Sequence, residues 1–185
     1  MGDVLVTLLA GFGMGVSFAA IITWVYSRRV EHTERALCVL ISDHGVGGTV
    51  HMRALDAKHT EFSCVIRGMA PGLHGFHVHQ YGDLREGCAS TCSHYNPTNE
   101  VHGSAVSAVR HAGDLGNIEA NALGVSESIV RVRVPLMDIM GRAIVIHADE
   151  DDLGLCATEE SRSTGTAGAR IACGVIVHAQ SVRVL

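Results

Sequence analysis

The chain has 185 residues, of which 21 are glycine and 4% are aromatic, and its net charge is −5 at pH 7. This length suits one domain of ordinary size plus an appendage. The many glycines and few aromatic residues favour a turn-rich β fold over a helical bundle. No basic block or basic–aromatic alternation occurs, so we expect no binding to nucleic acid. Six cysteines are too sparse for a small disulfide scaffold, and the absence of a C-x-x-C pair excludes a zinc ribbon.

Residues 4–26 form an uncharged apolar segment. As a helix of 23 residues it would measure about 34 Å, enough to cross the hydrocarbon core of a bilayer. Trp24 and Tyr26 stand at one end, where aromatic anchors occur. Three features argue against a cleaved signal peptide. Asp3 stands where a basic residue is usual, the apolar segment is longer than usual, and no small-x-small cleavage site follows it. A signal anchor is therefore favoured over a signal peptide or a buried soluble helix.

This interpretation divides the chain into a transmembrane signal anchor at 1–27, a juxtamembrane linker at 28–34 and a folded domain at 35–185. Arg28 and Arg29 follow the apolar segment, and no basic residue precedes it. The positive-inside rule then predicts a single-pass membrane protein whose domain faces the cytoplasm. The alternative is a secreted or lumenal domain, released after signal cleavage.

The folded domain reads as short strands separated by turns. Residues 36–41 are a continuous apolar run, and later segments alternate apolar with polar residues, which indicates strands with one buried face. The alternating positions are Val50 and Met52, then Phe62, Cys64 and Ile66, then Val130, Val132 and Val134. Residues 141–147 and 171–177 are two further apolar strands. We count eight strands, expect no helix in the domain, and predict an antiparallel sandwich or barrel.

Residues 75–114 contain five histidines and end in Asp114. His77 and His79 are two apart in a strand-like run, so their side chains share one face. Three more histidines follow on a long loop rich in Gly, Ser, Asn and Pro; they are His94, His102 and His111. Imidazole is the commonest metal ligand in proteins, and a bound metal would hold such a loop in place. The spacing therefore predicts a metal centre.

The other histidines lack a partner at ligand spacing, and we expect them at the surface. They are His32, His44, His51, His59, His74 and His178. His147 differs because it ends an apolar strand and precedes an acidic run at 149–152. On its own, a histidine in that position is more often structural than a ligand.

Eight motifs together resemble the copper/zinc superoxide dismutases of the eukaryotic type, over about residues 35–180. They are GFHVHQYGD at 75–83, GC at 87–88, HYNP at 94–97, HG at 102–103, RHAGDLGN at 110–117, GRAIVIHAD at 141–149, DDLG at 151–154 and AGARIACGVI at 167–176. The resemblance implies an all-β, eight-stranded antiparallel Greek-key sandwich or barrel with long metal-binding and channel loops. The apolar segment at 4–26 adds one transmembrane helix before it, which is unusual for the family. The resemblance also implies an oxidoreductase that dismutates superoxide to oxygen and hydrogen peroxide.

The resemblance assigns each ligand by position. The copper ligands are His77, His79, His94 and His147, and the zinc ligands are His94, His102, His111 and Asp114, so that His94 bridges both ions. Three imidazoles and one carboxylate suit a closed tetrahedral zinc site, and four nitrogens suit tetragonal copper. Asp151 matches a carboxylate that orients one copper and one zinc histidine. Arg170 matches the arginine that docks superoxide, and Cys88 and Cys173 match the family's disulfide.

The chain departs from the family pattern at several places. Ser163 stands where many members have a lysine that attracts superoxide, and Arg162 beside it is a possible substitute. Cys92 and Cys156 either form a second disulfide or remain free thiols. A homodimer is a possible partner arrangement, through the family's contact positions Tyr81, Gly82, Met140, Gly141 and Val175. His178 stands where an apolar contact is usual, which leaves pairing through the membrane helix as an alternative.

An alternative function is a non-catalytic dismutase-like module that binds copper or a partner protein. Chaperone relatives add a thiol-rich metal-binding motif, and no M-x-C-x-x-C or terminal C-x-C is present here. Inactive relatives typically lose a copper ligand or the docking arginine. This chain keeps all the matching ligands and Arg170, so an active enzyme is favoured.

Overall fold

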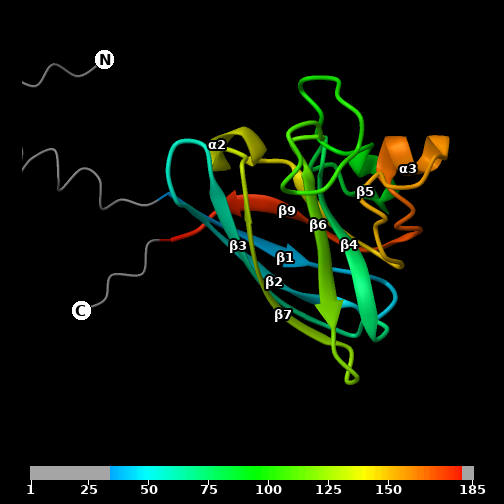
Figure 1. Cartoon of the computed structure of the whole chain (residues 1–185). Coiled ribbons are helices and arrows are strands. Elements are labelled where there is room, and N and C mark those ends of the chain that lie inside the picture. The colour runs from blue at the N-terminus through cyan, green and yellow to red at the C-terminus, as the bar shows by residue number, and fades with distance from the viewer. Residues whose placement is uncertain (1–33, 181–185) are drawn as a thin grey trace, which may run out of the picture. The chain divides into compact units, whose positions relative to one another are not determined.

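The computed structural model describes residues 34–180 of the chain (Figure 1). Eight strands form one antiparallel sheet, and a short ninth strand lies in a loop. The strands are β1 (Arg35–Leu40), β2 (Gly47–Ala54), β3 (Thr60–Arg67), β4 (Gly72–His79), β5 (Arg85–Cys88), β6 (Asp114–Ala120), β7 (Val125–Val132), β8 (Ala143–His147) and β9 (Arg170–His178). The predicted all-β class with an eight-stranded antiparallel sheet is confirmed.

The strand order in the sheet is β6-β4-β8-β9-β1-β2-β3-β7. Strands far apart in the chain pair with one another, namely β4 with β8, β9 with β1 and β3 with β7, which are the crossovers of a Greek key. The two edge strands, β6 and β7, follow one another through a tight turn in which Gly124 N donates to Asn121 O. This turn brings both edges of the sheet together and nearly closes the barrel.

The barrel interior is apolar, as the period-two pattern predicts. The alternating positions of β3, Phe62, Cys64 and Ile66, are at most 2% exposed. Phe62 packs edge-on against Phe76 of β4, with ring centroids 6.0 Å apart. Strand β8 is buried along its whole length, because loops cover the face that does not point into the barrel.

The expectation that the domain lacks helices is wrong for the described residues. A 3-10 turn, η1 (Ala89–Thr91), and two short helices, α2 (Leu136–Ile139) and α3 (Glu159–Thr164), lie in the connections. Thr158 caps α3 by accepting a hydrogen bond from Ser161 N, a local start signal in a segment that we interpreted as loop. These helices are too short to show helical periodicity in the sequence.

Two long connections lie on one side of the barrel. Residues 80–113 join β4 to β6 and contain β5 and η1, and residues 148–169 join β8 to β9 and contain α3. Figure 1 shows the green first connection and the orange second one next to each other, beside β4. Strands β4 and β8 are direct neighbours in the sheet, so their ends are held under both loops.

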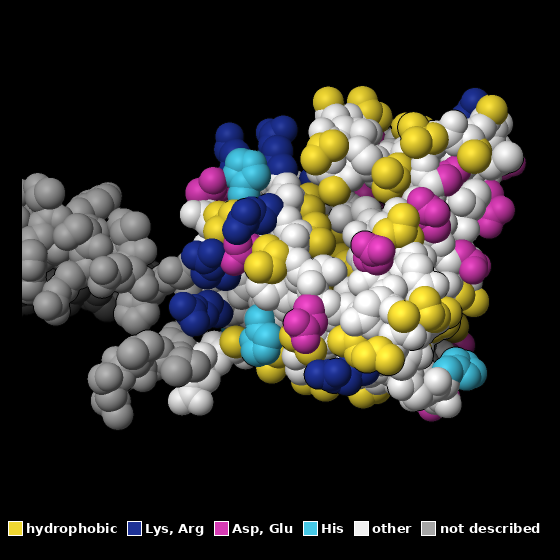
Figure 2. All heavy atoms as spheres, turned by 60° about the horizontal axis from the view of Figure 1, so that its bottom comes forward, with side chains coloured by type: hydrophobic (Ala, Val, Ile, Leu, Met, Phe, Trp, Pro, Cys, Tyr) yellow, Lys and Arg dark blue, Asp and Glu magenta, His cyan; other side chains and the backbone are white. Residues whose placement is uncertain are grey.

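Charge is distributed unevenly over the barrel surface. Arg35, Arg53, Glu61 and Arg131 form a cross-strand row at the end where β1 and β3 begin. Glu61 accepts hydrogen bonds from both Arg53 and Arg131, and it is only 8% exposed. Figure 2 shows most of the visible Lys and Arg side chains at one end of this face, and acidic side chains both there and over the rest of it.

Candidate metal centre

Four histidines from three segments meet under the two loops. His77 and His79 come from β4, His147 ends β8, and His94 comes from the first loop, joined to His79 by an isolated β-bridge. Each of the four offers one ring nitrogen within a group whose atoms lie within 4.8 Å of one another. All four side chains are buried, and the rings of His77 and His94 are only 4.0 Å apart. We call these four residues the first histidine group.

The outward ring nitrogens of this group are held by hydrogen bonds. His79 Nδ1 donates to Cys92 O at 2.8 Å, and His147 Nδ1 donates to Gly168 O at 3.0 Å. His77 Nε2 donates to the Asp151 carboxylate at 2.8 Å. Each bond fixes which ring nitrogen keeps its proton, so the other nitrogen presents a lone pair.

The inward nitrogens have no such partner within residues 34–180. The unsatisfied atoms are His77 Nδ1, His79 Nε2, His94 Nε2 and His147 Nε2. Buried polar atoms are rarely left without a partner, and four converging lone pairs are too costly to be accidental. The residues therefore fit a metal held by nitrogen ligands.

A second group lies on the other side of His94. Its members are His94, His102, His111 and Asp114, all buried. Asp114 Oδ1 is 2.9 Å from His94 Nδ1, 3.1 Å from His102 Nδ1 and 3.2 Å from His111 Nδ1. A tetrahedral ion with ligands at about 2.0–2.1 Å separates those ligands by about 3.3 Å. The second group therefore has the spacing of a closed tetrahedral site.

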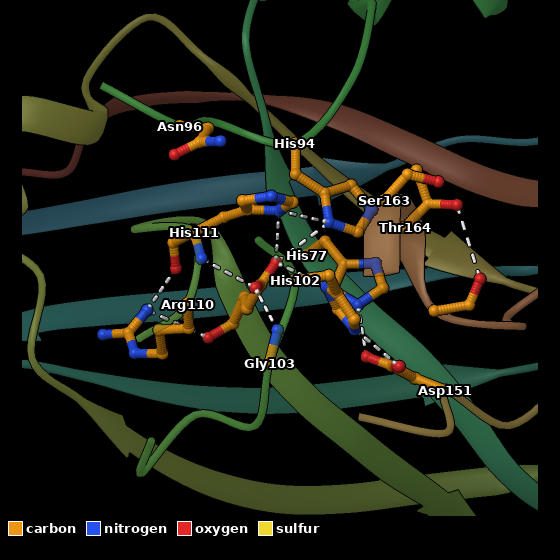
Figure 3. Close-up of polar contacts among 12 residues, drawn as sticks. His77, His94, Asn96, His102, Gly103, Arg110, His111, Asp151, Ser163 and Thr164 are labelled. Atoms are coloured by element: carbon orange, nitrogen blue, oxygen red, sulfur yellow. Dashed lines mark hydrogen bonds and ion pairs between the residues drawn. The ribbon is translucent and has the colours of Figure 1, made fainter. Parts of the chain in front are cut away.

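His94 belongs to both groups. Its Nδ1 faces Asp114, and its Nε2 faces the first histidine group without a hydrogen-bond partner. Figure 3 shows His94 between His77 and His111, with its ring in reach of both sides. Two adjacent cations could thus share this ring, as a bridging imidazolate requires.

The backbone orients the Asp114 carboxylate. Its Oδ2 atom accepts hydrogen bonds from Gly103 N at 3.1 Å and from His111 N at 2.9 Å. Oδ1 is left to face the three imidazoles. Burial acts to raise the pKa of Asp114, but hydrogen bonds from the histidines outweigh it and hold the pKa well below its usual range. The carboxylate is therefore charged, as a metal ligand must be.

Asp151 connects the two groups from outside. Its Oδ2 accepts from His77 Nε2 and its Oδ1 accepts from His102 Nε2, each at 2.8 Å. Asn117 of β6 holds the Asp151 backbone by two further hydrogen bonds of 2.8 Å. Gly165 is needed here because its φ is +70°, and a Cβ atom there would meet Asp151 Oδ1 at 2.1 Å.

Burial keeps the first histidine group neutral. Burial and the nearby His94 lower the pKa of His77 to about 3, although the hydrogen bond to Asp151 acts against the shift. Burial is also the main cause that lowers the pKa of His147 to about 4, and it places the pKa of His79 lower still. Neutral imidazole is the form that binds a metal, so these rings need not lose a proton first.

Arg170 lies at the start of β9, next to the first histidine group. Its guanidinium donates to the carbonyl oxygens of Cys88 at 2.7 Å and Cys92 at 2.6 Å, and to Thr91 Oγ1 at 3.2 Å. The same Cys92 carbonyl accepts the hydrogen bond from His79. Arg170 is thus held by the loop that also holds a member of the group.

Cys88 and Cys173 form a disulfide across 85 residues, which confirms the predicted pairing. The bond ties the first loop to β9, three residues after Arg170. Cys92 and Cys156 are exposed and free, so the second disulfide does not form. Among the two alternatives for these cysteines, free thiols are confirmed.

Two supporting residues escaped the sequence analysis. His74 is 2% exposed, not at the surface, and its ring nitrogens lie 2.8 Å from His147 O and 2.7 Å from Ala70 O. Its even position in β4 places it on the same face as Phe76, so strand alternation could have predicted its burial. Asn117 holds Asp151 from a distant strand, and the sequence offers no local signal for that contact.

Comparison with known proteins identifies the family. The family model described as copper/zinc superoxide dismutase matches residues 46–176. The chain is also 46% identical over 158 residues to the extracellular superoxide dismutase [Cu-Zn] of Brugia pahangi, which covers 80% of this chain and 78% of the relative.

The relative's name also corrects the predicted location. The domain was expected to face the cytoplasm, and similarity to a protein named as extracellular contradicts this prediction. Within residues 34–180, no helix is both long and apolar enough to cross a membrane. The anchor predicted at 1–27, with its membrane segment at 4–26, lies outside the described residues, so the predicted domain boundaries stay a prediction.

The family match agrees with the geometry of the two groups. It confirms the predicted activity, which is superoxide dismutation by an oxidoreductase, and copper and zinc as its cofactors. The chain belongs to the copper/zinc superoxide dismutase family.

Proposed function

We propose that this chain dismutates superoxide with copper held by the first histidine group and zinc held by the second. The copper ligands would be His77, His79, His94 and His147. The zinc ligands would be His94, His102, His111 and Asp114. The observation that carries this assignment is the set of unsatisfied inward nitrogens, since all four first-group rings contribute one. Bound copper would supply one-electron redox chemistry, alternating between its two oxidation states as successive superoxide anions react.

The chain's own residues would bind the anion and manage its protons. Arg170 offers a fixed positive charge beside the copper group, and hydrogen bonds to the Cys88 and Cys92 carbonyls fix the orientation of its guanidinium. His94 Nε2 faces the same space without a hydrogen-bond partner, while its Nδ1 is held in the second group. Nε2 would hold copper through its lone pair and, when not bound to the ion, would accept a proton from water and return it to the product peroxide.

The assignment is tested by measuring superoxide consumption and metal content on the same reconstituted full-chain sample. Replacement of His79 or His147 by alanine should abolish copper retention and activity. His51→Ala, at an exposed position on β2, is the matched control and should retain both. Full activity of either ligand variant would overturn the copper assignment. Copper and zinc retention without turnover in the unmodified chain would favour the non-catalytic binding module.

The working environment that we propose is extracellular. This location is supported by the 46% identical relative, which is named as an extracellular superoxide dismutase. Fractionation of cells that express the full chain, with detection of the domain in the medium or on the outer surface, tests the proposal. Recovery only from the cytosol would refute it.

We also propose a homodimer through the outer face of β1 and β9. Leu37 and Val177 lie opposite each other on these strands, and the exposed fractions of Val39, Ile41 and Val177 are 54%, 59% and 49%. An outer strand face that is apolar rather than polar is typical of a covered surface. Tyr81 is 55% exposed, and the next residue, Gly82, lies close to β9, because a Cβ atom there would be 3.0 Å from Val175 Cγ1.

A second copy of the chain fits this face, because two subunits related by a two-fold axis contact each other through the same patch on each subunit. Sedimentation analysis of Val39→Glu should show monomers where the unmodified chain forms dimers. Leu123→Glu, at an exposed position in the β6–β7 turn, is the control and should remain dimeric. A monomeric unmodified chain would refute the dimer.

A further inference from the structure

Arg110 is a buried cation that the proposed mechanism does not use. Only 9% of the residue is exposed, although arginine is rarely buried without a carboxylate partner. Among the described residues, no carboxylate oxygen forms an ion pair with its guanidinium; the nearby Asp114 carboxylate is occupied by histidines and backbone amides. Figure 3 shows Arg110 beside His111, at the edge of the second group.

The guanidinium instead binds backbone carbonyls. Nη1 donates to His111 O, to Ala112 O at 3.2 Å and to Asp114 O at 3.3 Å. These carbonyls belong to the four-residue turn that carries two of the proposed zinc ligands. A planar guanidinium offers several donors in a fixed geometry, so it can hold such a turn in a way that a single ammonium cannot.

The other arm of Arg110 reaches the barrel wall. Nη2 donates to Arg133 O at 2.7 Å, just after the end of β7. The following residue is fixed in turn, since Thr60 Oγ1 donates to Val134 O at 2.7 Å from the buried start of β3. Arg110 therefore connects the ligand turn to a rigid part of the sheet.

The side chain also touches the segment that carries a third proposed ligand. A Cβ atom on Gly103 would lie 3.3 Å from Arg110 Cβ, so the backbone after His102 packs directly on the Arg110 stem. Gly103 N is one of the two donors that orient Asp114. Contacts of Arg110 thus reach the backbone at or next to His102, His111 and Asp114.

We propose that Arg110 is the positioning residue of the zinc site, holding the ligand turn against the barrel so that its ligands converge before the ion arrives. This inference rests on the proposed zinc ligands. Ligands held in place by their supporting contacts lose less conformational freedom on binding, and removal of such contacts typically weakens metal binding about 10- to 100-fold. The effect should be confined to zinc, because Arg110 contacts only the second group.

The test uses the metal-free full chain with the variants Arg110→Lys and Arg110→Gln. Zinc affinity is measured by competition with a chromogenic chelator, and Co²⁺ serves as a spectroscopic probe of the same site. We expect both variants to bind zinc about 10- to 100-fold more weakly, with an altered cobalt ligand-field spectrum. Copper binding to the first histidine group should be unchanged. If Arg110→Gln does not fold, Arg110→Lys decides the outcome.

Two controls separate the possible failures. Arg131→Lys changes an exposed arginine of β7 that pairs with Glu61, and it should leave zinc binding unchanged. His111→Ala removes a proposed ligand and should weaken zinc binding strongly. Wild-type zinc affinity and cobalt spectrum in a folded Arg110→Lys variant would overturn the positioning role, even if its thermal stability fell. Unchanged zinc affinity in His111→Ala would instead refute the zinc assignment itself.

Discussion

The guanidinium of Arg170 donates a hydrogen bond of 2.6 Å to the backbone carbonyl of Cys92, which also accepts from His79. Cys92 has a φ of 65° and a ψ of −147°, a conformation that glycine adopts readily and other residues rarely. We expect Cys92→Gly to stabilise the fold by about 1 kcal/mol while keeping both hydrogen bonds. Denaturant unfolding measures the change. Cys92→Ala removes the thiol but keeps the strain, so equal stability of the two variants would contradict this explanation.

Ser163 is an exposed residue of α3, next to Glu159 and Glu160 at the start of the same helix. We expect Ser163→Lys to raise kcat/KM about twofold at low ionic strength, since a unit charge contributes a few tenths of a kcal/mol in water at a separation of about 10 Å. Stopped-flow superoxide decay at several salt concentrations measures the gain. The neutral variant Ser163→Gln is the control, and a gain that does not decrease with salt would rule out steering.

Asp151 accepts hydrogen bonds from His77 and His102, one member from each group. Asp151→Asn should lower retention of both copper and zinc by about 10- to 100-fold, because an amide cannot accept from both rings and hold their orientation. Metal content after dialysis against a chelator measures the loss. Asp152→Asn changes the neighbouring acid and should retain both metals. Equal losses in the two variants would show only a general effect of the acidic run.

Zinc binding should release a proton at neutral pH. Burial acts to lower the pKa of His102, but hydrogen bonds to Asp114 and Asp151 outweigh it and raise the pKa to about 9 in the metal-free protein. His102 is therefore protonated at pH 7 and must lose that proton to bind an ion. Calorimetry in buffers of different ionisation enthalpy should detect about one proton per zinc. Proton release that stays constant from pH 6 to pH 10 would contradict this assignment.

The raised pKa of His102 also makes the stability of the metal-free fold depend on pH. A pKa raised above the unfolded value means that the folded state binds the proton more tightly. The stabilisation from His102 is then complete below about pH 6.5 and is lost as the pH rises to about 9. Urea midpoints of the metal-free protein across this range measure it. His102→Gln should remove the pH dependence attributable to this residue.

The disulfide closes a loop of 85 residues. Removal of the bond by Cys88→Ser with Cys173→Ser should destabilise the fold by about 4–5 kcal/mol in the chain-entropy model. Denaturant unfolding under non-reducing conditions compares the variant with the unmodified chain. The double variant Cys92→Ser with Cys156→Ser changes the two free thiols and should unfold like the unmodified chain. Equal destabilisation of both double variants would show that the loss does not come from the bond.

The sequence by itself determined the local features of this protein. Period-two alternation reports which face of each strand is buried, so the interior positions of β3 and the shared face of His77 and His79 were predictable. The quoted motifs were enough to show the resemblance to the family, and that resemblance named the cysteines of the disulfide. The location of the domain was predicted wrongly. The basic residues after the apolar segment suggested that it faces the cytoplasm, and similarity to an extracellular relative contradicts this.

Only the tertiary structure decided how distant segments hold the centre. Asn117 fixes Asp151, the Cys92 carbonyl joins Arg170 to His79, and Arg110 connects a loop to the end of β7. These contacts form between backbone groups or residues far apart in the chain, so no local pattern of residue types reports them. His74 differs in part: strand alternation could have predicted its burial, whereas the two carbonyls beside its ring are set by the folded backbone. The sequence states which side chains are present, whereas the folding of the closed barrel determines which donors each backbone carbonyl meets.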